Sequence, residues 1–96
     1  MILEHALLRV RAGQSDAFEA AMTTAQPLIA ASPGFLGMEV RRASEEQGLC
    51  LLLVKWESIV HNRDGFRTSD RYQTRRKLLH GFHDPMPEVR YFGESL

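Results

Sequence analysis

The residues best suited to chemistry lie between positions 51 and 82, where an apolar run gives way to polar, helix-compatible sequence. Asn62 carries an amide that can donate a hydrogen bond to an oxyanion developing on a bound substrate. Helical spacing places Asn62, Phe66 and Ser69 on one face. Tyr72 would point away from that face if the helix were straight.

A break at Gly65 divides this helical sequence into a short first piece and a longer second piece, 66–80. Such a break can return Tyr72 to the side of Asn62. A purely structural interpretation fits the pattern as well: Asn62 ends the short helix, and Phe66 and Tyr72 belong to the core.

Basic residues are concentrated in the same region, with seven of the twelve between Lys55 and Lys77. Four of them recur at four-residue spacing: Arg63, Arg67, Arg71 and Arg75. The simpler interpretation is a solvated face partnered by Asp64 and Asp70. The functional alternative is capture of a substrate carboxylate or phosphate. Lys plus Arg equals Asp plus Glu at 12 each, so no overall charge favours nucleic acid or an anionic membrane as a partner.

Two histidines near the end of this region are candidate metal ligands. His80 and His83, with Asp84, have a spacing that metal sites use. Gly81 and Pro85 indicate a helix end instead, where a histidine lies beside the last carbonyls. We therefore predict no metal site.

Length and composition predict a single domain spanning residues 1–96, with 44% hydrophobic and 25% charged residues. The lone Cys50 excludes an intramolecular disulfide and fits a reducing compartment. The sequence carries neither an apolar run long enough for a bilayer nor the pattern of a signal peptide. These features predict a cytoplasmic protein without membrane partners.

The first half of the chain predicts a strand and a helix. Residues 2–11 alternate between two largely apolar faces. Ser15 or Asp16 is placed to cap the following helix, with Glu19 completing a capping box. Pro27 predicts a kink near Thr23 or a shorter helix. The helix core stripe comprises Phe18, Met22, Ala25, Leu28 and Ile29, and the sequence Ser32-Pro33-Gly34 ends the helix.

The second half predicts a hairpin, the broken helix and a last strand. Residues 35–42 and 49–56 alternate on either side of a short polar turn. In the first of these strands, Leu36 shares a face with Met38 and Val40, opposite Phe35. Residues 88–93 form the terminal strand.

The element order βαββαβ predicts an α+β, ferredoxin-like fold: a four-stranded antiparallel sheet with both helices on one face. The other face would expose Leu7 or Leu8 and part of the run 51–54. Because a soluble monomer rarely exposes such a patch, we predict a homodimer formed through the sheet face.

Four motifs carry a family resemblance. They are the sequences Ser-Pro-Gly-Phe-Leu-Gly at 32–37, Val-Lys-Trp-Glu-Ser at 54–58, Phe-Arg-Thr-Ser-Asp at 66–70 and Asp-Pro-Met-Pro-Glu-Val-Arg-Tyr at 84–91. Together they span most of the chain in the order found in the antibiotic biosynthesis monooxygenase family, which the chain resembles. That resemblance implies a dimeric α+β barrel built from ferredoxin-like protomers.

The resemblance also implies site residues. Oxygenases of this family that need no cofactor carry an Asn, a Trp four residues later and a Tyr six beyond that, which makes Asn62, Phe66 and Tyr72 the expected catalytic set. Phe66 departs from the pattern because it lacks the indole N–H. The expected substrate-binding residues are His5, Trp56, Ser69 and Arg76. Of these, His5 faces either the pocket or the dimer interface, and Trp56 is alternatively a core residue at the end of its strand.

Haem is disfavoured as a cofactor. The family's haem-degrading members use a histidine as axial ligand, and the nearest equivalent here is Arg76, which cannot act as a neutral nitrogen ligand. The sequence also has no glycine-rich fingerprint for flavin or nicotinamide. We therefore expect no cofactor, so the substrate itself must supply the electrons.

The resulting hypothesis is a homodimeric, cofactor-independent monooxygenase acting on a small aromatic or quinol-like substrate held between the sheet and the broken helix. The alternative is a non-catalytic dimer of the same fold that binds a small ligand.

Overall fold

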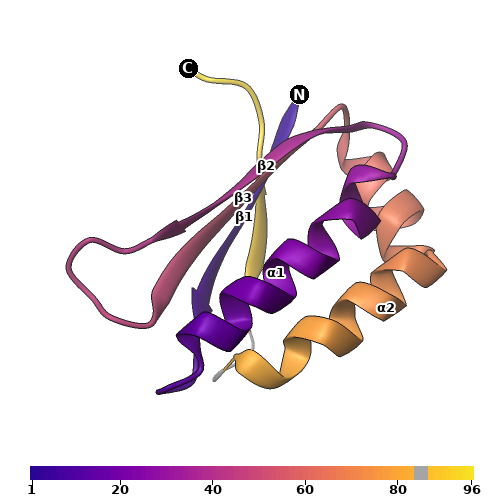
Figure 1. Ribbon diagram of the computed structural model, residues 1–96. Helices are drawn as coiled ribbons and strands as arrows, with labels where there is room; N and C mark the ends of the chain where they lie inside the picture. Colours follow the sequence, from indigo (N-terminus) through magenta and orange to yellow (C-terminus); the bar gives the residue numbers. More distant parts are fainter. Residues whose placement is uncertain (84–86) are drawn as a thin grey trace.

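The computed structural model describes residues 1–83 and 87–96. The main elements follow the predicted order: β1 (Ile2–Arg9), α1 (Ser15–Ala30), β2 (Phe35–Arg42), β3 (Leu49–Trp56), α2 (Asp70–Leu79) and β4 (Val89–Phe92). Three short helical turns join them: η1 (His61–Gly65), η2 (Phe66–Thr68) and η3 (His80–Phe82). The ferredoxin-like α+β fold is confirmed (Figure 1).

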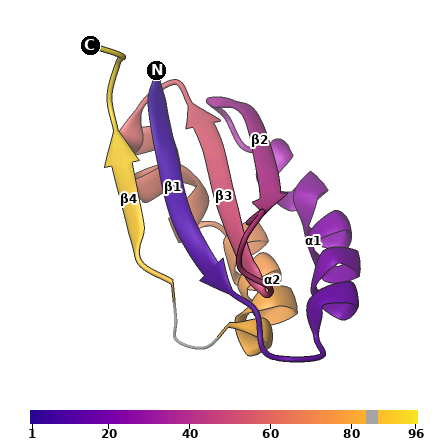
Figure 2. The ribbon, with the colours of Figure 1, turned by 90° about the vertical axis from the view of Figure 1, so that its left-hand side faces the viewer.

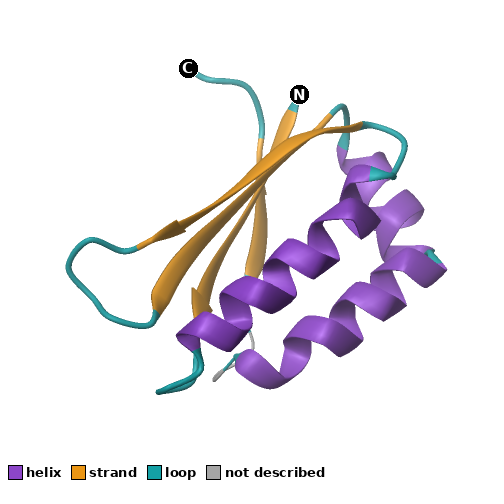
Figure 3. Ribbon diagram, viewed as in Figure 1, coloured by secondary structure: helices purple, strands orange, loops and turns teal. Residues whose placement is uncertain are grey.

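The four strands form one antiparallel sheet in the order β2-β3-β1-β4 (Figure 2). The two most apolar strands, β1 and β3, occupy the middle and pair from Ile2 opposite Trp56 to Arg9 opposite Leu49. Both helices cover the same face of the sheet, and no described element covers the other, which is called the bare sheet face below (Figure 3).

Strand alternation divides the sheet residues between these two faces. Ala6, Leu8, Leu52 and Val54 face the helices and are buried. On the other face, the side chain of Leu7 is 48% exposed. The apolar run in β3 is therefore covered by helices on one side only, so the predicted need for cover on the second face stands.

The α1 helix supplies the other half of the core through Phe18, Met22, Ala25 and Ile29, which are buried as the periodicity predicts. Its start differs from the prediction. Gln14 is the N-cap residue, and no side chain makes a capping hydrogen bond among the described residues.

Further along α1, Glu19 does not complete a capping box; it forms an ion pair with Arg42 of β2. The helix also runs past Pro27 to Ala30 rather than ending early, and the amide of Ala31 donates to the Pro27 carbonyl at 3.1 Å. The turn after it ends the helix where predicted, with Gly34 at a φ of +82°.

The predicted alternation in β2 is wrong at its first residues. A register shift lies between Phe35, which pairs with Trp56, and Gly37, which pairs with Lys55. This bulge puts Phe35 on the helix side, where its ring meets Trp56 edge-on at 5.8 Å. Leu36 is left 51% exposed instead of sharing the buried face.

Within the described part of the chain, no helix is long and apolar enough to cross a membrane.

Candidate functional site

The segment between β3 and α2 changes direction twice, and this shapes the candidate site. A π-helical turn from His61 to Gly65 passes into the 3-10 turn, and Ser69 then adopts an extended conformation. Ser69 Oγ accepts a hydrogen bond from the Tyr72 amide at 3.2 Å and so caps α2. The α2 helix therefore begins at Asp70, four residues later than predicted.

This double break brings the three expected catalytic residues together. Asn62, Phe66 and Tyr72 all line one cavity of about 180 Å³ between the sheet and α2. The rings of Phe66 and Tyr72 meet edge-on with centroids 5.5 Å apart. Residues of β1, β3 and α1, such as Ala6 and Leu52, give the cavity an apolar floor.

Asn62 is held in place from behind the cavity. Its side chain is only 1% exposed, and its Oδ1 accepts a hydrogen bond from the Tyr91 hydroxyl of β4. That contact leaves the amide Nδ2 as the group available to a ligand oxygen. Burial raises the pKa of Tyr91, so the phenol remains protonated and a donor near neutral pH.

Glu4 is a site residue that sequence reasoning missed. It lies on the buried face of β1, lines the same cavity and is 6% exposed. Its Oε1 accepts a hydrogen bond from Trp56 Nε1 at 3.0 Å, and its Oε2 lies 3.6 Å from Arg67. The sequence did carry a signal for it: Glu4 is an acidic residue on the same strand face as Ala6, Leu8 and Val10. Burying a carboxylate there without a partner costs free energy, so a partner was to be expected.

The arginines at four-residue spacing do not form one face. Arg63 lies beside Asp64 at the surface, 3.3 Å away, whereas Arg67 and Arg75 line the cavity. Arg71 donates to Ser32 Oγ at 3.4 Å. The predicted solvated face is therefore correct for Arg63 only. The helix break separates Arg67, Arg71 and Arg75 from Arg63 and gives them different neighbours.

Arg67 joins two walls of the cavity. Its guanidinium carbon lies 5.9 Å from the centroid of the Tyr72 ring, a cation–π arrangement, and its Nη2 approaches Glu4. Arg75, one turn further along α2 than Arg71, has a buried Nε without a hydrogen-bond partner among the described residues. Burial lowers the pKa of Arg75, and the negative charge of Glu4 opposes that shift.

The expected substrate-binding residues are divided. Arg76 lines the cavity with the catalytic set. Trp56 is fully buried behind Glu4 and Phe66, and Ser69 caps α2; neither lines the cavity. His5 lies on the sheet face away from the helices, beside Phe92, with ring centroids 5.7 Å apart. Of the two positions left open for His5, the structure gives the bare face.

The histidines after α2 mark a helix end, as predicted. His80 Nδ1 donates to the Arg76 carbonyl at 3.1 Å. His83 is 8% exposed, lines the cavity and packs edge-on against Phe18. Asp84, the third candidate ligand, lies outside the described residues, among which no group of three metal-ligating side chains is found.

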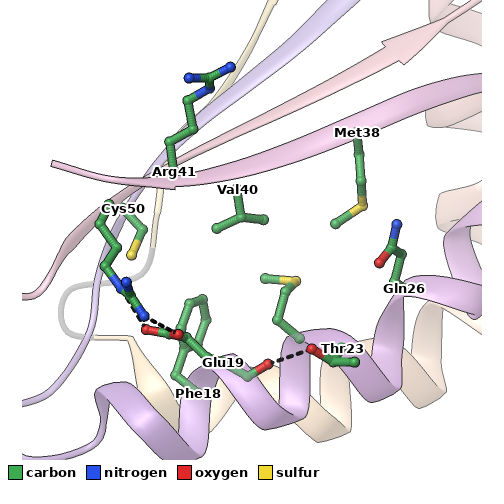
Figure 4. Close-up of a pocket in the computed structure, with 10 residues that line it drawn as sticks. Phe18, Glu19, Thr23, Gln26, Met38, Val40, Arg41 and Cys50 are labelled. Atoms are coloured by element: carbon green, nitrogen blue, oxygen red, sulfur yellow. Dashed lines mark hydrogen bonds and ion pairs between the residues drawn. The ribbon is translucent and has the colours of Figure 1, made fainter.

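A second hollow lies between α1 and β2 (Figure 4). It is larger and more open, about 590 Å³, and Phe18, Met38, Val40 and Cys50 line it. Its charged groups are already paired: Glu19 with Arg42, and Arg41 with Glu39. Burial raises the pKa of the Cys50 thiol, which disfavours the reactive thiolate. The cavity at Asn62 is therefore the better candidate for chemistry.

Comparison with known proteins places the chain in a family. The sequence profile of the antibiotic biosynthesis monooxygenases matches residues 1–77. A relative from Bacillus subtilis (strain 168), the uncharacterized protein YczJ, is 37% identical over 92 residues, which cover 96% of this chain and 97% of the relative.

Solved structures agree with this assignment. A Bordetella bronchiseptica protein assigned to the antibiotic biosynthesis monooxygenases superimposes with a TM-score of 0.93 at 30% identity, covering 99% of this chain and 97% of that protein. SnoaB, a cofactor-independent oxygenase from Streptomyces nogalater, shares the fold with a TM-score of 0.85 at 14% identity, covering 99% and 93% of the two chains. The chain belongs to the antibiotic biosynthesis monooxygenase family.

Proposed function

We propose that this protein is a cofactor-independent monooxygenase that acts on a small aromatic or quinol-like substrate in the cavity at Asn62. One observation carries the proposal: a buried amide, Asn62, and a buried carboxylate, Glu4, line the same apolar-floored cavity with two aromatic rings. Kinship with a family that holds monooxygenases supports it, as does the fold shared with SnoaB, an oxygenase that needs no cofactor.

In the proposed reaction Glu4 takes a proton from a quinol hydroxyl, and the Asn62 amide donates a hydrogen bond to the resulting oxyanion. The quinolate gives one electron to O₂, and the superoxide couples to a ring carbon that bears hydrogen. Loss of that hydrogen as a proton breaks the O–O bond, leaving one oxygen on the ring and releasing the other as water. Quinol and O₂ thus give hydroxyquinone and water, with all electrons supplied by the substrate.

Phe66 cannot donate a hydrogen bond to the oxyanion of the substrate. It offers a ring face and no donor, and the indole N–H of nearby Trp56 is committed to Glu4. Stabilisation of the oxyanion therefore rests on Asn62, with Arg67 contributing its charge at the cavity wall.

The same observation about Phe66 favours the second candidate, a small-ligand-binding dimer without turnover. In that case the cavity binds the aromatic ring, and the missing indole donor marks the loss of catalysis. Under this alternative, Asn62→Ala leaves both ligand binding and cellular effect unchanged.

We propose a homodimer through the bare sheet face for either function. Its support is the apolar surface left uncovered there, including Leu7 at 48% and Phe92 at 49% exposure. The cavity lies on the opposite, helix-covered side, so each protomer would carry its own site.

The test of the oxygenase proposal is oxygen uptake by chelator-treated, desalted protein supplied with a panel of quinols and anthrones. We expect uptake above the buffer control, reduced about 100-fold by Asn62→Ala. Gln47→Ala, in the exposed turn before β3, serves as the control and leaves uptake unchanged. No uptake above buffer would remove the oxygenase function for those substrate classes.

A further inference from the structure

One end of the cavity is not used by the proposed chemistry. It is formed by Arg75 of α2 and by His83, which follows η3. His83 is 92% buried, since its exposure is 8%, and its Nδ1 has no hydrogen-bond partner within residues 1–83 and 87–96; the same holds for Arg75 Nε. Buried polar atoms without partners cost free energy, so they point to a group that completes them.

The charges around the cavity are also unbalanced. Among the described residues that line it, one carboxylate, Glu4, stands against three guanidinium groups, Arg67, Arg75 and Arg76. Arg67 lies closest to Glu4, at 3.6 Å, whereas no ion pair holds Arg75 or Arg76 in the described part of the chain. Because a guanidinium keeps its proton under ordinary conditions, Arg75 remains a half-buried cation whose Nε is buried without an acceptor among the described residues, which favours an anion beside it.

Cavity size restricts the ligand that brings this anion. The cavity holds about 180 Å³. A closed protein cavity of about 150 Å³ accommodates one benzene molecule. The space at Asn62 therefore encloses one aromatic ring with small substituents, and a system of three fused rings would extend out of it into solvent.

We propose that the substrate is a single-ring phenol or quinol bearing a carboxylate, which pairs with Arg75 and accepts a hydrogen bond from His83 Nδ1. For the position of the reactive hydroxyl, beside Glu4 and Asn62, this inference rests on the proposed function. The two ends of the cavity correspond to the two ends of β1. Glu4 pairs with Tyr91 near the start of the strand, and Val10, just after the strand, pairs with His83. The two sets of groups belong to the same cavity, because Glu4, Asn62, Arg75 and His83 all line it.

A carboxylate fits this end better than other anions. The planar fork of a guanidinium matches the two oxygens of a carboxylate, and the charge-assisted contact is stronger than a neutral one. A phosphate monoester would add volume to a cavity that already holds little more than one ring. The binding test therefore includes inorganic phosphate as a competitor.

Binding in the absence of turnover tests the inference. Calorimetric titration under argon compares 4-hydroxybenzoate with 4-hydroxybenzamide, a neutral molecule of nearly the same shape. The carboxylate is expected to bind about tenfold tighter or more. Arg75→Met should remove that preference, and Arg63→Met, the matched change at the surface arginine beside Asp64, should keep it.

Equal affinity of the acid and the amide for the unaltered protein would overturn the inference. So would a preference that survives Arg75→Met, or one that Arg63→Met removes as well. Strong competition by inorganic phosphate alone would indicate a simple anion site and contradict an aromatic acid as the ligand.

The folding of the variants is checked by thermal melting. Removing a half-buried charge that has no ion-pair partner among the described residues should leave the melting temperature of Arg75→Met unchanged or higher. If that variant fails to fold, Arg75→Lys replaces it. The lysine keeps the charge and loses the fork, so a reduced but measurable preference is expected, and an unreduced one contradicts the proposal.

The oxygenase proposal and the carboxylate proposal fail separately. Acid preference without oxygen uptake supports the carboxylate site and removes the oxygenase. Uptake of neutral quinols with no acid preference supports the oxygenase and removes the carboxylate site.

Discussion

The Tyr91 hydroxyl of β4 donates a hydrogen bond to Asn62 Oδ1 across 29 residues of sequence. This contact joins the last strand to the π-helical turn that begins the broken helical segment. Because Asn62 Oδ1 accepts this hydrogen bond, the Nδ2 group of the amide is the one that remains available to a ligand. The position of the proposed oxyanion donor therefore depends on a residue that does not itself line the cavity.

Tyr91→Phe should lower the free energy of unfolding by about 1–3 kcal/mol, because Asn62 Oδ1 is left buried without a donor. Urea denaturation measures the change. Tyr72→Phe is the control, since the Tyr72 hydroxyl makes no hydrogen bond within the described residues, and it should cost less. Equal losses for the two variants would show that the Tyr91 contact contributes nothing specific.

Glu4→Gln should reduce turnover by about 100-fold or more while changing stability little. The amide oxygen of glutamine still accepts the hydrogen bond from Trp56 Nε1, but the group no longer takes a proton. Steady-state oxygen uptake measures the effect. Glu46→Gln, at the exposed ion pair with Arg9, is the matched control. Full activity in the Glu4 variant would remove its role as base.

His83 makes the stability of the fold dependent on pH. Burial lowers its pKa from the ordinary value of about 6.5, and the charge of Arg75 and the proximity of His80 lower it further. The unfolded chain therefore binds more protons than the folded chain just below pH 6.5. Stability from this group is present above that pH and is lost as pH falls from it towards the folded-state pKa.

Denaturant unfolding at a series of pH values from neutral into the window just below 6.5 measures this slope. In His83→Gln the slope should become shallower, whatever the absolute stability of the variant. His80→Gln, at an exposed position, should keep most of the slope. An unchanged slope in His83→Gln would show that another group is responsible.

Gly34→Ala should destabilise the fold more than Gly13→Ala, by about 1–3 kcal/mol. Both glycines have a positive φ, +82° and +76°, so both variants bear the cost of the left-handed conformation. A Cβ at Gly34 would lie 2.2 Å from His61 Cγ, whereas nothing lies within 4 Å of one at Gly13. Thermal unfolding gives the comparison, and equal costs would mean that the His61 ring moves aside freely.

Leu7→Glu should convert the proposed dimer to a monomer, because it places a charge in the middle of the bare sheet face. Sedimentation velocity at micromolar concentration distinguishes the two states. Val60→Glu changes a residue of similar exposure, 52% against 48%, which lies just before η1 and outside the sheet, and should leave the dimer intact. A monomer for the unaltered protein would contradict the proposed interface.

The fold could be predicted from the sequence because its signals are local. Alternation in residues 2–11 and the three-to-four spacing of Phe18, Met22 and Ala25 each determine an element and its buried face. The bulge at Leu36 could not be predicted this way, because it depends on how β2 pairs with β3. The capping prediction at Asp16 and Glu19 failed for a similar reason: Glu19 forms an ion pair with Arg42 of the neighbouring strand.

The site was harder to predict than the fold. Resemblance identified Asn62, Phe66 and Tyr72, which the structure brings to one cavity, and the glycine in the middle indicated the break. Glu4 and Tyr91 come from the two ends of the sequence and reach the site only through the pairing of β1 with β4. No local pattern distinguishes Arg75, in the cavity, from Arg63, at the surface, because the turn at Ser69 separates them.

The most direct test of the central claim is the origin of the oxygen in the product. Chelator-treated protein is given the best substrate of the panel under ¹⁸O₂, and the product is analysed by mass spectrometry. We predict that one ¹⁸O atom enters each product molecule, with no added cofactor, and that Asn62→Ala slows its appearance. Product carrying oxygen from water only, or formed equally fast without protein, would contradict the proposed oxygenase.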